Sequence, residues 1–554
     1  MNEVSVLVGG KAGDGITNAG ALIAQILNHC GYYVYLYNDY PSLIRGGHNF
    51  AIIRAADEPV AVHRNRVDFI LALDQRTVDQ HRDASPDCAL IVNADLVKSA
   101  YSGQGISLRA ILAAETAPAI MGNSAMIGAF AKTAGIAWDT IDQVFRAHVP
   151  KGLDQNLRVA RRAYDQVQTV RLIEPRSRPA LAVISGNEAI SLGLVKAGLS
   201  AYVSYPMTPS SGILHFLAEQ ADRFGLTVIH PENEIAVILM ALGFSYAGKR
   251  VAVGTSGGGF CLMTEGLSLA GMAELPLVIV VSQRTGPSTG LPTYTGQSDL
   301  RFVIHAGQGE FPRLVVAPAD AQEAYHWSAV AMNLAWKYQI PAIILSDKTL
   351  SEGMYSFDPE KADDAGTDAQ EPLSWNKIPP YFRYRNMPSG ISPLAFPGEK
   401  DAIVKVDSYA HDEAGITTET AGTVSLMAKK RMSKQVGLAS ELMEYPAVHV
   451  GGVPDAPVAL LCWGSVRGAC EEVASTLGLR VVQPIVLEPF PTAQVTLACS
   501  GVSRLIGVEE NAHGQLAALA REHGIDVYAD VLKFDGRPLT PDELLARVQA
   551  VMTR

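Results

Sequence analysis

The chain has 554 residues, which is enough for three or four domains, and its formal net charge is −11. Such a negative balance argues against nucleic acid or an anionic membrane as the main partner. No apolar run approaches the roughly 18–20 residues that a membrane span needs. The N-terminus lacks the basic and then apolar pattern of a signal peptide, so we expect a cytoplasmic protein.

Six cysteines are spread along the chain, and none of them forms a CxxC pair. Most lie in apolar surroundings, which favours buried free thiols. An iron–sulfur cluster usually needs four thiolates close together. The sequence therefore predicts neither a cluster nor another metal site held by this chain alone.

The first expected element is a strand over residues 4–8, followed by a glycine-rich turn over 9–15 and a helix over 16–27. This order can present backbone N–H groups and a helix N-terminus to an anion, but a tight packing corner gives the same pattern. Further strands complete an α/β domain over residues 1–175; they are expected at residues 32–37, 49–54, 69–73 and 89–93.

Arg45 and His48 lie in a glycine-rich loop after the strand at residues 32–37. From such a loop they can reach an anionic ligand or a neighbouring subunit, and the alternative is an ordinary polar loop. Residues 174–179, which contain Pro and Arg, then mark the end of the first domain.

From residue 180 to residue 351, strands and helices alternate as in a doubly wound parallel domain. Three of the expected strands cover residues 201–205, 250–255 and 277–282. In an open parallel sheet, ligands bind at the carboxyl ends of the strands. We therefore expect the loops after these three strands to meet at one site.

The residues after these strands suit an anionic ligand. Thr208 is predicted to cap a helix that begins at Pro209. A glycine turn at residues 257–259 follows the second strand, and Arg284 follows the third. A helix N-terminus, a glycine turn and an arginine together predict a site for a carboxylate or a phosphate.

A further helix is predicted from Glu232 to about Ala247, closed by Gly248. Residues 235–240 are apolar on every side, which predicts that the helix is buried. Glu234 at its start is then buried as well. Acidic residues at a helix start can simply complement the helix dipole, but a desolvated carboxylate favours a functional role for Glu234.

Residues 352–446 are dense in Pro, Asp, Glu and Gly and lose regular periodicity, so we expect an extended connector over a neighbouring domain or subunit. Asn511 and His513 belong to a final α/β domain over residues 447–554 and follow one of its strands, where we expect a helix-capping or interface role. The strands of that domain are expected near residues 458–462, 480–484 and 504–508.

Residues 205–211 resemble the Tyr-Pro-Ile-Thr-Pro-Ser-Ser motif of the 2-oxoacid:ferredoxin oxidoreductases, with Met207 in place of Ile. The chain as a whole resembles the α subunit of that family with a γ-type domain fused at its N-terminus. The other matches are residues 232–234, the Arg284 loop, residues 390–393, Asp412 with Glu413, and residues 509–511.

The resemblance implies a multidomain α/β fold, with a γ-type domain, a doubly wound domain for the pyrimidine side of thiamine diphosphate, and a transketolase-C-like domain. It implies that Glu234 contacts the aminopyrimidine ring of the cofactor and that Pro206 lies against the same ring. Arg284 and Thr208 would bind the carboxylate and the oxo group of a 2-oxoacid. Burial suits Glu234 to a proton-sharing role.

The resemblance also implies a β subunit that carries Mg²⁺, the diphosphate site, a [4Fe–4S] cluster and the contact with ferredoxin. Thiamine diphosphate would then be shared between the two subunits, and two αβ heterodimers would form the assembly. Coenzyme A is the implied co-substrate, with Gly10, Gly13, Gly15 and Arg45 as candidate contacts.

The implied reaction is the reversible, coenzyme A-dependent oxidative decarboxylation of a 2-oxoacid. The fused arrangement and residues 40–48 look most like the members that convert 2-oxoglutarate to succinyl-CoA and CO2, a reaction of the tricarboxylic acid cycle. A second carboxylate needs a second cation, which His48 or Arg45 can supply. Pyruvate and branched-chain 2-oxoacids remain open.

Two other functions compete with this one. A thiamine-dependent component of the transketolase or dehydrogenase type would work without ferredoxin and without an iron–sulfur partner. A nucleotide-binding regulatory subunit, built on the N-terminal glycine turn, would bind NAD or ATP tightly and would not depend on Glu234.

Overall fold

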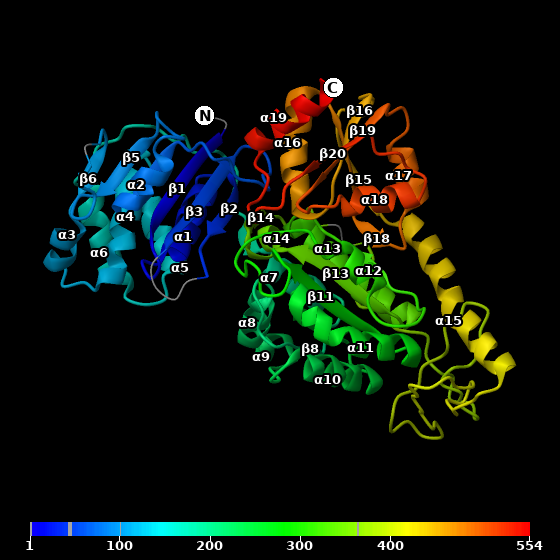
Figure 1. Cartoon of the computed structure of the whole chain (residues 1–554). Helices are drawn as coiled ribbons and strands as arrows, with labels where there is room; N and C mark the ends of the chain where they lie inside the picture. The colour runs from blue at the N-terminus through cyan, green and yellow to red at the C-terminus, as the bar shows by residue number, and fades with distance from the viewer. Residues whose placement is uncertain (1–2, 43–46, 100, 363–364, 554) are drawn as a thin grey trace. The chain divides into compact units, whose positions relative to one another are not determined.

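The computed structural model describes residues 3–42, 47–99, 101–362 and 365–553. The described chain is α/β and forms two compact units, each with its own core (Figure 1). The first unit contains residues 1–185, 352–359 and 540–546, and the second contains residues 186–351, 360–539 and 547–554. The expected α/β fold class is confirmed, while the four domain ranges expected from the sequence stay a prediction.

The first unit is built on a mixed sheet in the order β6-β5-β4-β1-β3-β2-β14-β7. The central strand β1 runs antiparallel to β3 and parallel to β4, and Val4, Val6 and Val8 are buried in the core. The strands are β1 (Glu3–Lys11), β2 (Tyr33–Asp39), β3 (His48–Ala56), β4 (Phe69–Ala72), β5 (Ala89–Asn93), β6 (Gln104–Ile106), β7 (Ala182–Ser185) and β14 (Met354–Phe357).

The five strands expected in this unit are confirmed, but β7 and β14 were not predicted. Both are four residues long, and β14 pairs with β2 and with β7, so their place depends on long-range pairing rather than on local periodicity. The helices of the first unit are α1 (Ile16–His29), α2 (Gln75–His81), α3 (Leu108–Ala114), α4 (Gly122–Thr133), α5 (Trp138–His148) and α6 (Leu153–Tyr164), with a 3-10 turn at Ala119–Met121.

The second unit contains a seven-stranded sheet in the order β18-β12-β13-β11-β10-β8-β9. Every pair in it is parallel except β12 with β18, which confirms the predicted doubly wound parallel arrangement. The strands are β8 (Ala201–Val203), β9 (Thr227–Ile229), β10 (Val251–Thr255), β11 (Leu277–Gln283), β12 (Leu314–Val316), β13 (Pro341–Asp347) and β18 (Val486–Glu488).

Helices lie on both sides of this sheet. The longest, α13, carries Trp327 and Trp336, which are buried core residues. The helices before, between and after its strands are α7 (Gly186–Lys196), α8 (Ser211–Glu219), α9 (Ala221–Phe224), α10 (Glu234–Tyr246), α11 (Gly257–Ala273), α12 (Leu300–His305), α13 (Ala321–Tyr338) and α14 (Lys348–Glu352).

A five-stranded sheet in the order β15-β17-β16-β19-β20 forms the C-terminal part of the chain. The predicted capping role of Asn511 is confirmed, because its Oδ1 accepts from the backbone N–H groups of His513, Gly514 and Gln515 at the start of α18. The elements are β15 (Val448–Gly452), β16 (Val458–Leu461), β17 (Arg480–Pro484), β19 (Arg504–Glu509), β20 (Ala529–Leu532), α16 (Arg467–Leu477), α17 (Thr492–Ala498), α18 (Gln515–Glu522) and α19 (Pro541–Met552), with 3-10 turns at Leu442–Glu444 and Gly464–Val466.

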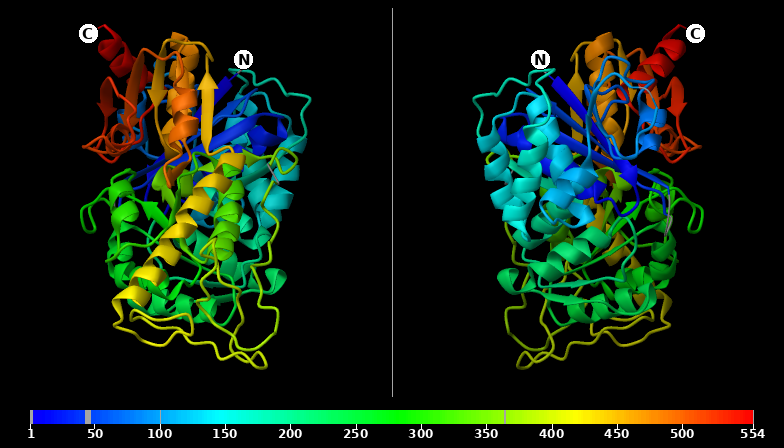
Figure 2. Two further views of the ribbon diagram at one scale, coloured as in Figure 1. Left: turned by 90° about the vertical axis from the view of Figure 1, so that its right-hand side faces the viewer. Right: turned by 90° about the vertical axis from the view of Figure 1, so that its left-hand side faces the viewer.

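The loss of periodicity predicted for the whole of residues 352–446 is wrong for its last part, where residues 421–441 are helical. The described residues between 360 and 420 are largely irregular, but α15 (Ala421–Glu441) is a 21-residue helix (Figures 1 and 2). Its buried face contains Lys430 and Lys434 as well as Met427 and Leu438. Two buried lysines conceal the apolar stripe by which an amphipathic helix is recognised.

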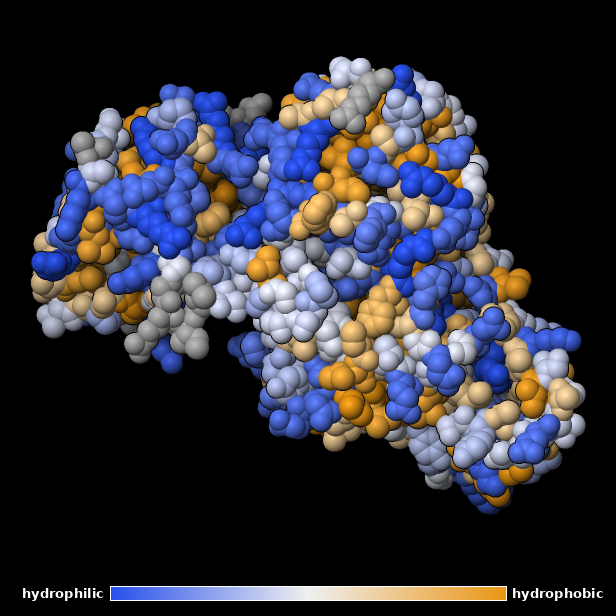
Figure 3. Space-filling view, in the orientation of Figure 1, coloured by the Kyte–Doolittle hydropathy of each residue, from blue (hydrophilic) through white to orange (hydrophobic). Residues whose placement is uncertain are grey.

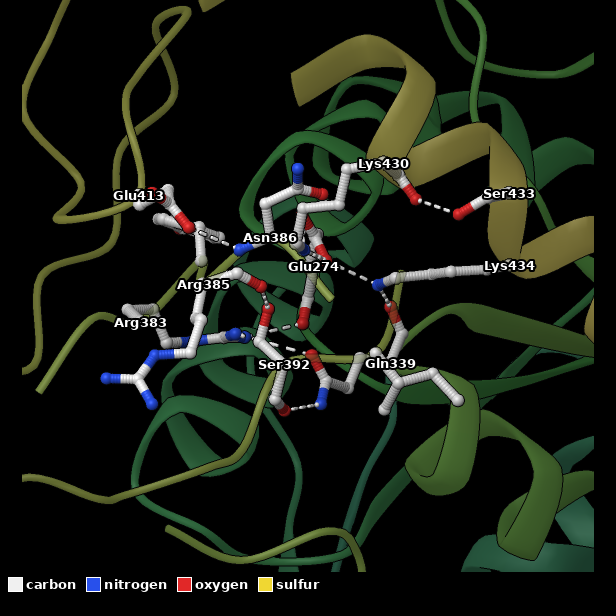
Figure 4. A network of polar contacts seen from close by, with 12 residues as sticks. Glu274, Gln339, Arg383, Arg385, Asn386, Ser392, Glu413, Lys430, Ser433 and Lys434 are labelled. Carbon is white, nitrogen blue, oxygen red and sulfur yellow. Dashed lines mark hydrogen bonds and ion pairs between the residues drawn. The ribbon is translucent and has the colours of Figure 1, made fainter. Parts of the chain in front are cut away.

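The buried lysines of α15 share one carboxylate, that of Glu274 at the end of α11 (Figure 4). Lys430 Nζ lies 2.7 Å and Lys434 Nζ 2.5 Å from Glu274 Oε2. Arg383 Nη2 donates to the Glu274 carbonyl at 2.7 Å, and Lys434 Nζ donates to the Gln339 carbonyl at 3.2 Å. Figure 4 shows that these side chains converge from α11, from α15 and from the irregular segment.

Among the residues that the structure describes, no helix combines the length and the apolar character of a membrane span.

Candidate active site

Three adjacent strands of the second unit end at the candidate site. In the sheet β11 is next to β10 and β10 is next to β8, all parallel, with Val281 aligned to Thr255 and Val253 aligned to Val203. Because parallel neighbours in register end at one edge, the loops after them converge. The prediction that these three strand ends meet is confirmed.

The loop after β8 differs from the prediction at its helix start. Residues 207–210 form a turn in which the backbone N–H of Ser210 donates to the Met207 carbonyl at 2.9 Å and Ser210 Oγ donates to it at 2.8 Å. The helix α8 therefore begins at Ser211, with Ser210 as its N-cap. Thr208 is not the N-cap, so the prediction that the helix begins at Pro209 is wrong by two residues.

Arg284 and Thr208 lie together, as the sequence suggested. Arg284 Nη1 donates to the backbone carbonyl of Thr208 at 2.8 Å, and both residues are half-buried. This bond joins the end of β11 to the loop after β8. Because an arginine has five N–H donors, the guanidinium keeps donors for an anionic ligand. Pro206, two residues before Thr208, is also half-buried.

Glu234 is buried at the start of α10, with 4% of its surface exposed. The preceding residue, Asn233, is the N-cap, and its Oδ1 accepts from the backbone N–H of Ala236 at 3.0 Å. Glu234 Oε1 is buried and has no hydrogen-bond partner within the described part of the chain. A buried carboxylate oxygen without a partner costs free energy, so this atom is suited to a bound ligand.

Gly259 allows the Glu234 carboxylate to lie close to the start of α11. The turn predicted at residues 257–259 is in fact the first turn of α11, which begins at Gly257. A Cβ added at Gly259 would lie 2.5 Å from Glu234 Oε1 and would also overlap the Thr255 side chain. A glycine is therefore required for the carboxylate to approach the start of α11.

A cavity of about 520 Å³ opens beside these residues. Among the described residues that line it, Arg284 and Asp299 are the charged ones. Sequence analysis did not single out Asp299, which lies in a polar stretch with no motif around it. The cavity is lined by Met207, Ser256, Gly257, Gly258, Cys261, Arg284, Gly286, Pro287, Ser288, Thr289, Asp299 and Phe302.

The prediction that α10 is buried on every side is wrong. Ile235, Leu239 and Met240 are 48%, 45% and 46% exposed, and Leu262 on the neighbouring α11 is 50% exposed. The two helices pack closely, since a Cβ at Gly266 would meet the Ile238 side chain at 2.6 Å. Figure 3 shows apolar residues gathered on the surface over α10 and α11. We call Ile235, Leu239, Met240 and Leu262 the α10–α11 face.

In the first unit, the predicted strand, glycine turn and helix are confirmed. β1 continues through Gly10, and α1 begins after Gly15, whose φ is 72°. The Asp14 carboxylate accepts from the backbone N–H of Lys11 at 3.1 Å and so satisfies one donor of the turn itself. A Cβ at Gly13 would meet no atom within 4 Å, which leaves that side of the turn open.

His48 is buried in the first unit, at the start of β3. Its Nε2 lies 2.9 Å from His81 Nε2, and its ring stacks on Phe50. Burial lowers the pKa of His48, and burial lowers the pKa of His81 to about 4, so both imidazoles are neutral near pH 7. Within this unit His48 is therefore a polar neutral group rather than a cation. Arg45 lies outside the described residues.

Two family models match the chain. Residues 193–430 match pyruvate flavodoxin/ferredoxin oxidoreductase, thiamine diphosphate-binding. Residues 5–166 match pyruvate ferredoxin/flavodoxin oxidoreductase. The first match contains Thr208, Glu234 and Arg284, and the second contains the glycine turn and His48.

Related proteins match over most or all of the chain. Subunit alpha of 2-oxoacid:ferredoxin oxidoreductase 2 from Aeropyrum pernix is 30% identical, over 100% of this chain and 98% of the relative. The 2-oxoglutarate oxidoreductase subunit KorA from Mycobacterium tuberculosis is 32% identical over 67% of this chain and 57% of the relative. A solved structure is also similar: 2-oxoglutarate:ferredoxin oxidoreductase from Magnetococcus marinus, with 2-oxoglutarate, coenzyme A and succinyl-CoA bound, at 29% identity, 99% coverage of both chains and a TM-score of 0.89.

Proposed function

Because the chain belongs to the 2-oxoacid:ferredoxin oxidoreductase α subunits, we propose that it catalyses, with a β subunit, the reversible oxidative decarboxylation of 2-oxoglutarate. In the forward direction 2-oxoglutarate and coenzyme A give succinyl-CoA and CO2, and two electrons leave one at a time to ferredoxin. The choice of 2-oxoglutarate is supported by the ligands of the Magnetococcus marinus structure and by the name of the Mycobacterium tuberculosis relative.

The observation that carries the proposal is the buried, unpartnered Oε1 of Glu234. Its surroundings fit the pyrimidine side of thiamine diphosphate, since Gly259 leaves room beside the carboxylate and the preceding residues Gly257 and Gly258 line the cavity. When bound, the cofactor supplies the nucleophilic carbon that attacks the 2-oxo group. Glu234 would hold a proton between Oε1 and a ring nitrogen, with Pro206 against the ring.

Arg284 is proposed to bind the carboxylate of the 2-oxoacid, since a guanidinium forms short, charge-assisted bonds with carboxylates. Its bond to the Thr208 carbonyl fixes its direction. Thr208 is proposed to contribute its hydroxyl to the substrate's oxo group. Both side chains would act by orienting the substrate before its carbon–carbon bond breaks.

The first unit is proposed to contact coenzyme A and the far end of the substrate. Gly10, Gly13 and Gly15 are the proposed contacts of coenzyme A, and the open side of Gly13 supports this. His48 is proposed as a neutral hydrogen-bonding group for the second carboxylate. The cation that this carboxylate needs is then left to Arg45 or to the β subunit.

The β subunit is proposed to dock on the α10–α11 face and to carry Mg²⁺, the diphosphate site and a [4Fe–4S] cluster. Large exposed apolar patches are typical of subunit interfaces. This face lies beside Glu234, so a subunit bound there would complete the cofactor site. A dimer of two such αβ heterodimers is the proposed assembly.

The test is to purify the complex of this chain with its β subunit and to measure viologen reduction with coenzyme A and each of three substrates: 2-oxoglutarate, pyruvate and a branched-chain 2-oxoacid. We expect the highest kcat/KM for 2-oxoglutarate. Higher values for another 2-oxoacid would overturn the substrate, and no reduction with any of them would overturn the function.

The role of Glu234 is tested in the same complex by Glu234→Gln. We expect kcat to fall at least about 100-fold, because positioned proton transfer is worth that much or more. The matched control is Glu232→Gln, since Glu232 is exposed two residues earlier. Equal activities of the two variants would contradict the assignment.

A further inference from the structure

The cavity beside Arg284 contains an acidic group that the function above does not use. Asp299 lines the cavity with its carboxylate against the start of α11, since a Cβ at Gly257 would overlap Asp299 Oδ2. The charged or titratable groups that face it are Arg284, from the end of β11, and the Cys261 thiol, from α11. A carboxyl group and a guanidinium cation therefore share this cavity.

The backbone of Asp299 is held firmly by the residue next to Arg284. Its N–H donates to Gln283 Oε1 at 2.9 Å, and the fully buried Gln283 donates from Nε2 to the Ser346 carbonyl at 3.2 Å. Although Asp299 is the N-cap of α12, its side chain makes no capping hydrogen bond. The backbone of Asp299 is thus fixed in place, while its carboxylate is not required to cap the helix.

The surroundings of Asp299 oppose its charge. Burial raises the pKa of Asp299 to about 6, while the Ser298 hydroxyl and Arg284 act in the opposite direction. The Arg284 guanidinium also donates a hydrogen bond to the Thr208 carbonyl, so its interactions are not confined to Asp299. A second carboxylate in the same cavity would disfavour the ionised form further, because two like charges cannot easily share one cation.

We propose that Asp299 is a substrate-binding residue that takes up a proton when the carboxylate of the 2-oxoacid binds Arg284, and then donates this hydrogen to a substrate carboxylate oxygen. The inference rests on the proposed function. The proton comes from solvent, and no covalent bond of the substrate changes in this step. When Asp299 is ionised it competes with the substrate for Arg284, and when it is protonated it adds a donor.

The proposal predicts a pH-dependent KM. The substrate binds the form with protonated Asp299, so KM for the 2-oxoacid should rise with pH above about 6, by up to about tenfold per pH unit. The value of kcat at saturating substrate should change much less. A residue with a merely structural role would not make KM depend on pH while kcat stays nearly constant.

The experiment compares the αβ complex with its Asp299→Asn variant between pH 5.5 and 8.5. In the variant we expect KM to be nearly independent of pH and at least about tenfold below the wild-type KM at pH 8. The matched control is Asp222→Asn, because Asp222 is exposed on α9 and should leave the wild-type profile unchanged. Parallel profiles of wild type and Asp299→Asn would overturn the proposal.

A second measurement needs no variant. Calorimetric titration of the wild-type complex with a 2-hydroxy acid, which has the same carboxylate but cannot be decarboxylated, is run at pH 7.5 in two buffers of different ionisation enthalpy. We expect close to one proton taken up per ligand bound, and no uptake would overturn the proposal. A wild-type complex without 2-oxoacid-dependent activity would instead overturn the proposed function, so the two failures are distinguishable.

Discussion

At the carboxyl end of β19, the neighbouring side chains of Glu509 and Glu510 are both buried but have different hydrogen bonding. The Glu510 carboxyl accepts from the backbone N–H of Leu539 at 2.8 Å, and burial together with Asp347 raises its pKa to about 8. Near neutral pH Glu510 is therefore largely protonated. The Glu509 carboxylate accepts hydrogen bonds of 2.7–3.1 Å from Trp463, Asn511, Leu516 and Ala517.

The raised pKa of Glu510 predicts that stability falls with rising pH. An unfolded Glu loses its proton near pH 4.3, so between about pH 5 and 8 the folded state binds more protons and its free energy of unfolding decreases as pH rises. Glu510→Gln removes this dependence. We expect the Tm of the variant, relative to wild type, to increase from pH 5.5 to pH 8.

Thermal unfolding at the two pH values checks this prediction. Glu219→Gln is the control, since Glu219 is exposed at the end of α8 and should shift Tm equally little at both. A Tm difference between Glu510→Gln and wild type that is the same at pH 5.5 and pH 8 would refute the raised pKa.

Single site residues differ in how far the sequence could predict them. The burial of Glu234 follows from an acid at the start of an apolar helix, and Arg284 directly follows a buried strand. Asp299 has no comparable signal in the sequence. It enters the cavity through the path of the loop after β11 and through its bond to Gln283, and neither is encoded in local periodicity.

At the scale of elements, α15 is anchored by charge rather than by apolar packing alone. The Lys430 and Lys434 side chains are 0% and 1% exposed, as is Glu274 at 1%. Burial opposes ionisation of Glu274, but the two lysines lower the pKa of its carboxyl, and burial lowers the pKa of Lys434 to about 7. One carboxylate thus faces two buried lysines, and because the pKa of Lys434 is about 7, Lys434 is only partly protonated at neutral pH.

Glu274→Gln would leave the two buried lysines without the counter-charge that favours their protonated forms. Loss of one partner of a buried ion pair costs about 3–5 kcal/mol. We expect α15 and the irregular residues 360–420 to detach more often, and limited proteolysis in that segment to become faster by about 100-fold or more. The control is Asp142→Asn, which breaks the exposed pair with Arg146 on α5 and should leave cleavage unchanged. An unchanged cleavage rate in Glu274→Gln would contradict the anchoring role.

The α10–α11 face leads to a prediction about the subunit complex. Leu239→Glu places a charge on this exposed face, so the folded chain should keep its Tm while its affinity for the β subunit falls at least about tenfold. Co-purification and a binding titration measure the effect. Leu497→Glu is the matched control, because Leu497 on α17 is 75% exposed and lies outside this face. Equal binding by both variants would exclude the face as the docking site.

Across the whole molecule, the alternation of strands and helices predicted the parallel sheet and the place of the site within it. It did not predict the strands that join a sheet from a distant part of the chain, namely β7, β14 and β18. These strands are three or four residues long, and each pairs with a strand that is distant in the sequence, so no local pattern marks where it joins the sheet. Each of these strands pairs with a sheet edge that the rest of the fold leaves unpaired.

The position of strand β18 affects what happens when the chain is truncated. It belongs to the C-terminal sequence, yet it closes the edge of β12 in the sheet that bears Glu234 and Arg284. A polypeptide that stopped at residue 446 would keep the candidate site but lose this strand, exposing the unpaired backbone of Leu314–Val316. Open edges of this kind promote aggregation. We therefore expect a chain divided at that point to aggregate more readily than the intact chain.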